Sequence, residues 1–87
     1  MKLKVTVNPN PFSSELFIFI QSDVSLNTVL KLTDDKENLV RMVGCPLQKG
    51  ENKIHIKNLA RYVVGGYQLE LKLLNGELLE SVELVKA

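Results

Sequence analysis

Few side chains in this sequence are of the kinds that carry out chemistry, and those few stand apart. His55 is the only histidine and Cys45 the only cysteine. One of each on separate segments does not make a zinc site or a Cys–His nucleophile pair. His55 also lies between Ile54 and Ile56, so strand alternation turns its ring away from the face that the two isoleucines share. We therefore predict a solvated histidine and a free, structural thiol.

A carboxylate cluster and a glycine pair are the remaining candidates. Asp34, Asp35 and Glu37 lack the alternating oxygen ligands and central glycine of a calcium-binding loop, which favours a solvated hairpin tip over a weak ion site. Gly65-Gly66 is followed by neither a helical pattern nor a Lys-Ser/Thr pair, so it indicates a bend and not a phosphate-binding loop. The sequence therefore predicts a protein that is not an enzyme and has no catalytic residue, metal or cofactor.

The elements around these residues are predicted to be strands, because apolar residues recur at every second position. The pattern predicts seven of them, near residues 3–7, 16–20, 30–32, 40–42, 54–56, 67–73 and 82–84. Asn75-Gly76 suits a two-residue hairpin turn, in which both central residues need positive φ. Seven short strands in 87 residues predict an all-β, immunoglobulin-like antiparallel β-sandwich. Antibody domains themselves are excluded, because a cysteine pair and a tryptophan are absent.

Size and charge narrow the function classes further. A chain of 87 residues makes one domain, residues 1–87, and its 11 basic and 10 acidic side chains leave a net charge of +1. No basic cluster favours nucleic acid or an anionic membrane surface, and no apolar run approaches the roughly 20 residues of a membrane span. The first residues alternate and lack the apolar stretch of a secretory signal, so an upstream segment would have to supply one for export.

The most distinctive segment is Val7-Asn8-Pro9-Asn10-Pro11-Phe12, directly after the first predicted strand. Two prolines in three residues fix φ twice and push the preceding residues toward extended conformations. The segment resembles the opening motif of the C-terminal sorting domains of the bacterial type IX secretion system. Other features agree in order, namely a "Leu-x-x-Leu-x-x-Gly-x-Tyr" pattern at 59–67, in which Tyr62 stands for the second leucine, and a terminal strand ending in a basic residue.

The resemblance implies a folded signal that routes an upstream cargo domain from the periplasm to the cell surface or the extracellular space. Its partners would be the secretion machinery and a sortase that cleaves between cargo and signal. Carried over by motif, the recognition residues are Pro9, Asn10, Pro11, Phe12, Gly65, Tyr67, Val85 and Lys86. Lys86 is expected to be the clearest partner contact, since a terminal basic residue has little packing to do.

Each of these residues also has a purely structural interpretation. The two prolines would set a turn, Phe12 would plug the end of the sandwich, and Gly65 would supply a backbone conformation closed to other residues. Tyr67 would be a core aromatic whose hydroxyl reaches a backbone group. The family usually carries Asp-x-x-Gly between its third and fourth strands, whereas Glu37 stands at the glycine position, so Asn38 is expected to adopt the left-handed conformation.

Two further hypotheses stay open. An adhesion or carbohydrate-binding β-sandwich module is the alternative function, although it would usually display more aromatic rings. In the all-apolar segment 16–20, Leu16, Ile18 and Ile20 are expected to face the core, which places Phe17 and Phe19 on the outer face. That pair is either a docking patch, used by a partner or a weak homodimer, or a pair of rings covered by long neighbouring side chains.

Overall fold

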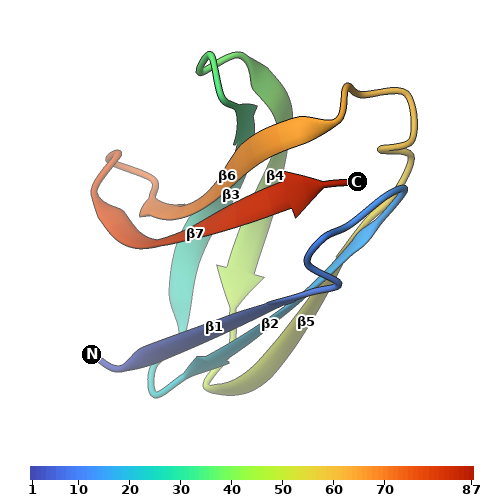
Figure 1. The fold of residues 1–87 in the computed structure, drawn as a ribbon. Helices are drawn as coiled ribbons and strands as arrows, with labels where there is room; N and C mark the ends of the chain where they lie inside the picture. Colours follow the sequence, from blue (N-terminus) through green and yellow to red (C-terminus); the bar gives the residue numbers. More distant parts are fainter.

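The computed structural model describes residues 1–87 and consists of seven strands joined by turns and loops (Figure 1). The strands are β1 (Leu3–Asn8), β2 (Leu16–Ser22), β3 (Leu26–Asp34), β4 (Leu39–Leu47), β5 (Gly50–Ile56), β6 (Gly65–Leu73) and β7 (Leu78–Lys86). Their number and order agree with the predicted pattern, although every strand extends beyond its predicted segment. No element is a helix that could cross a membrane.

The strands form two antiparallel sheets that pack face to face. One sheet has the order β1-β2-β5 and the other the order β4-β3-β6-β7, and Figure 1 shows the two sheets as separate layers. The predicted immunoglobulin-like β-sandwich is therefore confirmed. In constant-type antibody domains the fourth strand lies beside the fifth, whereas here β4 pairs with β3.

The core lies between the sheets and follows the strand alternation. Leu16, Ile18 and Ile20 have no exposed surface, which confirms that this face of β2 points inward. The opposing sheet contributes leucines from β3 and β6, including Leu30, Leu32, Leu69 and Leu71, all of them buried. β2, β3 and β6 are the central strands of their sheets, so each has a neighbouring strand on either side. Their inward side chains are therefore covered by the side chains of both neighbours as well as by the opposing sheet.

Two turns differ from their predictions. Asn75-Gly76 does not form a two-residue turn, because Leu73 and Glu77 pair through the Leu73 amide and leave residues 74–76 as the loop. Only Gly76 of this loop has positive φ, at 94°, as in a type I turn followed by a left-handed residue. In the β3–β4 hairpin the left-handed residue is Glu37 (φ 65°) and not Asn38. Hydrogen bonds from the Lys36 and Asn38 amides to the Asp34 carboxylate hold Glu37 in that conformation.

Candidate functional site at the end of the C-terminal strand

Phe12 ties the loop after β1 to the end of β7. Its amide donates to the Val85 carbonyl (2.9 Å), and its carbonyl accepts from the Ala87 amide (2.8 Å), which makes a parallel bridge between Phe12 and Lys86. The ring is 1% exposed and meets the Tyr67 ring edge to face, with centroids 5.6 Å apart. Phe12 therefore closes the end of the sandwich. Figure 1 shows the C-terminus beside the loop that joins β1 to β2.

Asn10 continues this contact through its side chain. Its Oδ1 accepts from the Val85 amide (3.0 Å) and its Nδ2 donates to the Glu83 carbonyl (3.3 Å). The amide group thus occupies the place of a peptide group in a neighbouring strand, and it satisfies two backbone groups on the free edge of β7. Together Asn10 and Phe12 cap that edge from Glu83 to Ala87. The peptide bonds preceding Pro9 and Pro11 are both cis.

Gly65 and Tyr67 lie opposite this cap, at the start of β6. Gly65 pairs with Lys86 and has a φ of 146°, as predicted for a conformation that side-chain-bearing residues rarely adopt. The Tyr67 hydroxyl donates to the Val63 carbonyl. A tyrosine near the start of the sixth strand, bonded to backbone a few residues upstream, is the tyrosine corner of immunoglobulin-like sandwiches. Burial raises the pKa of the Tyr67 phenol, and Asp34 and Asp35 raise it further.

Lys86 differs from its prediction as a free contact residue. Its side chain is buried, at 5% exposure, and its Nζ lies 3.5 Å from the Ala60 carbonyl oxygen. The reason is alternation, because Val82, Leu84 and Lys86 share the inward face of β7 and Lys86 simply continues the series. Its aliphatic stem packs while its ammonium group reaches a carbonyl. The neighbouring Val85 points outward instead and is 51% exposed.

A shallow acidic depression adjoins Val85 on the outer face of the four-stranded sheet. It has a volume of about 560 Å³, and Gly66 contributes to it with no side chain. The carboxylates that line it are Asp34, Asp35, Glu37 and Glu83. Backbone hydrogen bonding from Asn38 holds the pKa of the Asp34 carboxyl below its usual value. Motif reasoning did not identify this depression, because its lining comes from a hairpin and two strands that are distant in sequence.

The predicted docking pair lies on the other sheet. Phe17 and Phe19 face outward from β2, and both rings are half-buried. The His55 ring covers Phe17 by stacking on it, with centroids 4.3 Å apart and an interplanar angle of 9°. His55 is exposed, as predicted, and its Nε2 lies 3.4 Å from Glu15 Oε2. The cover given by a neighbouring side chain therefore fits Phe17, while a docking role for the pair stays a prediction.

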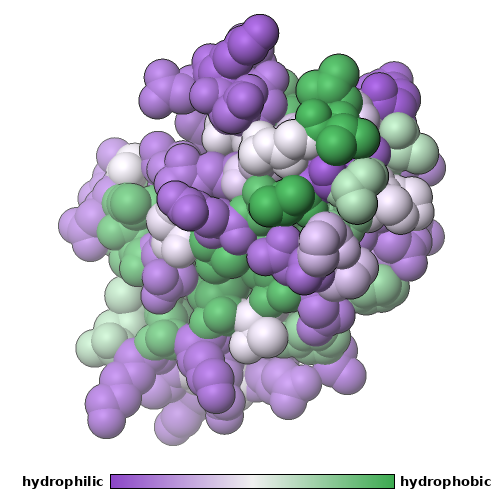
Figure 2. Space-filling view, viewed as in Figure 1, coloured by the Kyte–Doolittle hydropathy of each residue, from purple (hydrophilic) through white to green (hydrophobic).

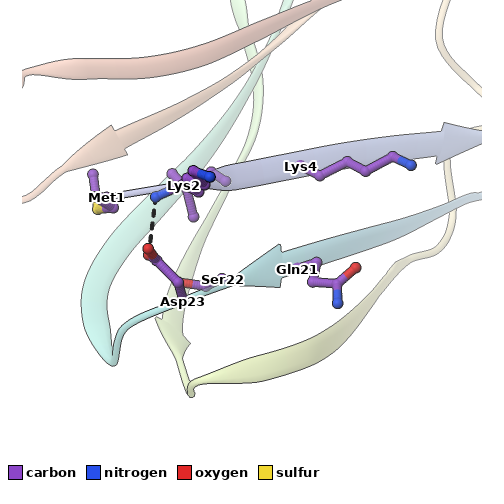
Figure 3. A pocket seen from close by; sticks show the side chains of 7 residues that line it. Met1, Lys2, Lys4, Gln21, Ser22 and Asp23 are labelled. Carbon is purple, nitrogen blue, oxygen red and sulfur yellow. Dashed lines mark hydrogen bonds between the residues drawn. The ribbon is translucent and has the colours of Figure 1, made fainter.

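Among the remaining surface features, Arg41 and Arg61 line one depression, where Arg61 Nη2 donates to the Tyr62 hydroxyl (3.1 Å). A depression of about 640 Å³ lies beside the start of β1, where the Lys2 amide donates to Asp23 Oδ1 (2.9 Å). In Figure 3 its labelled side chains spread along the surface and do not converge on one point. Cys45 is buried and unpaired, and burial raises the pKa of its thiol. No three His, Cys, Asp or Glu side chains lie close enough together to hold a metal ion.

The structure brings the recognition residues of the resemblance to one end of the molecule, around the last residues of β7, and leaves the Phe17/Phe19 pair apart from them. The sequence did not identify the role of Asn10, since nothing in its neighbours indicates that its amide meets a strand 73 and 75 positions away. Comparisons with protein-family models and with curated proteins find no match to this sequence.

Proposed function

We propose that this domain is a non-catalytic sorting signal of the type IX secretion kind, which a protein partner recognises at the end of β7. One observation carries the proposal. Residues from three separate motifs, Asn10 and Phe12 from the first, Gly65 and Tyr67 from the second, and Val85 from the third, form a single contiguous structure.

Some of these residues are buried and support the site, and others are exposed and available to a partner. Phe12, Tyr67 and Lys86 are buried, so they hold the end of β7 in place instead of touching a partner. Val85 is exposed and lies beside the acidic depression. A partner that contacts Val85 therefore also meets the carboxylates of the depression. The same proposal includes an upstream cargo domain and a sortase that cleaves between the cargo and this domain.

This division changes how the proposal is tested. Deleting residues 85–87 removes the bridge to Phe12 and the pairing of Lys86 with Gly65, so the truncated domain is expected to lose stability, and its failure to be exported would show nothing about recognition. Val85→Glu is the sharper change, because it alters an exposed side chain and leaves the backbone hydrogen bonds intact.

We expect residues 1–87, fused behind a reporter with a signal peptide, to bring the reporter to the surface of a type IX-competent bacterium. Val85→Glu should leave most of the reporter in the periplasm. Val24→Glu, an exposed valine in the β2–β3 turn, is the matched control and should be exported like the parent. Both variants should melt like the parent domain. Normal export of the Val85→Glu fusion, or no export of the parent fusion, would refute the proposal.

A further inference from the structure

The side of the sandwich between the edge strands β1 and β7 leaves part of the core half-covered. Its half-buried apolar residues are Leu3, Val5 and Val7 on β1 and Leu79 and Val82 on β7. In Figure 2, which has the view of Figure 1, apolar atoms lie in the region between the two strands, with polar atoms around them. This side therefore presents an apolar strip bounded by two strand edges.

The opposite side of the sandwich also has half-buried apolar residues, Val40, Val43, Ile54 and Tyr62, but side chains bridge it. There Arg41 Nη1 on β4 donates to the Lys57 carbonyl after β5 (3.1 Å), and the Tyr62 hydroxyl donates to the Val40 carbonyl (3.4 Å). Pro46 also removes one backbone donor from the β4 edge. Between β1 and β7 the only comparable closure is the cap made by Asn10 and Phe12, which ends at Glu83. The first part of β7 and the whole of β1 keep free edges.

Charges of opposite sign mark these two edges. Lys2 and Lys4 stand at the start of β1, and Glu77 and Glu80 stand at the start of β7. The two strands run in the same direction, because Phe12, in the loop after β1, makes a parallel bridge with β7 (Figure 1). The lysines and the glutamates therefore lie toward the same end of the open side.

We propose that this open side binds a second copy of the same chain, with β1 of each copy pairing in parallel with β7 of the other. A two-fold axis along the strands produces this arrangement and places Lys2 and Lys4 opposite the partner's Glu77 and Glu80. An axis across the strands would instead pair β1 with β1 and β7 with β7 in antiparallel fashion, so that no lysine of β1 would lie opposite a glutamate of β7. Charge complementarity selects the first arrangement.

The proposed dimer continues each sheet through the interface by strand addition and covers both apolar strips. It also accounts for the extent of the Asn10 and Phe12 cap, which covers only the part of β7 beyond the region that carries Glu77 and Glu80. The competing explanation is that the charges keep two free edges from pairing at all.

Charge reversal distinguishes these explanations. We expect sedimentation velocity on the isolated domain, from micromolar to millimolar concentration, to show a reversible dimer that salt weakens. Lys2→Glu/Lys4→Glu and Glu77→Lys/Glu80→Lys should each raise the dimer dissociation constant by roughly ten- to a hundredfold, because several exposed ion pairs become repulsive. Mixing the two variants should restore a heterodimer, since both of its edges are complementary again.

The chain carrying all four substitutions tests whether the lysines of one copy face the glutamates of the other. In the proposed arrangement its edges are complementary, so it should dimerise about as well as the parent chain. With β1 against β1 and β7 against β7, by contrast, neither double variant would lose affinity, because each strand would still meet a strand of its own charge. All variants should melt like the parent, because the exchanged side chains are at the surface. A parent chain that stays monomeric throughout, or a fourfold variant that does not recover dimerisation, would overturn the proposal.

Discussion

The two hairpins of the four-stranded sheet, β3–β4 and β6–β7, have the same backbone plan. Each has a register shift after a core leucine, Leu32 in the first and Leu71 in the second. Three loop residues follow, and the third has positive φ, Glu37 in the first hairpin and Gly76 in the second. The backbone hydrogen bonds that close the two loops also correspond, and their donor–acceptor distances range from 2.9 to 3.1 Å.

The hairpins differ in what makes the left-handed residue tolerable. Gly76 adopts φ 94° because it has no Cβ. Glu37 has a Cβ, and the Asp34 carboxylate compensates by accepting hydrogen bonds from the Lys36 and Asn38 amides, at 2.9 and 2.8 Å. In the second hairpin only Asn75 plays a similar part, by accepting from the Glu77 amide. One turn geometry can therefore be reached by a permissive residue or by a side-chain clamp.

The largest expected effect comes from giving the second hairpin a β-branched residue at its left-handed position. Gly76→Val should destabilise the domain by about 2 kcal/mol, because valine is strained at positive φ. Gly44→Val is the matched control, since a Cβ meets no atom within 4 Å at either glycine and only Gly76 has positive φ. Urea unfolding should place the control within about 0.5 kcal/mol of the parent. Equal losses of stability in the two variants would show that the positive φ of Gly76 is not the cause.

A smaller effect is expected when the first hairpin receives the residue type of the second. Glu37→Gly should stabilise the domain by about 0.5 kcal/mol, because relief of the left-handed strain exceeds the added entropy of the unfolded chain. Lys36→Gly, at a neighbouring position without positive φ, should destabilise by about 0.5–1 kcal/mol. Urea midpoints that move in the same direction for both variants would show that Glu37 is not strained.

The smallest effect is a difference in pH dependence between the hairpins. The pKa of Asp34 is lowered below 3.8, first by the backbone hydrogen bond from Asn38. Because the folded value is the lower one, its stabilisation is complete above the unfolded pKa and is lost as the pH falls through the folded pKa. The melting temperature of Asp34→Asn should therefore lie below that of the parent at neutral pH and approach it in acid. A constant difference across this range would show that the charge contributes nothing, and Asn75→Ala should show no such trend.

Local patterns predicted much of the fold and part of the site. Alternation identified the inward face of β2, and the structural interpretations of Gly65 and Tyr67 predicted a positive φ and a backbone-bonded tyrosine. The turn residues were less predictable. Asn75-Gly76 suggested a two-residue turn and Asn38 the left-handed position, because neither pattern contains the Asp34 clamp or the register shifts that set the loop length.

The sequence by itself determined which side chains share a strand face, because that depends only on the period of two along an extended chain. The prediction of Lys86 as a free contact was wrong because it weighed the charge of the residue and not this period, which puts Lys86 on the buried face with Leu84. Only the tertiary structure decided that the Asn10 amide caps β7, that Phe12 meets Tyr67, and that β1 and β7 border one open side. These contacts join residues far apart in the chain, so they exist only after both sheets have closed over a common core.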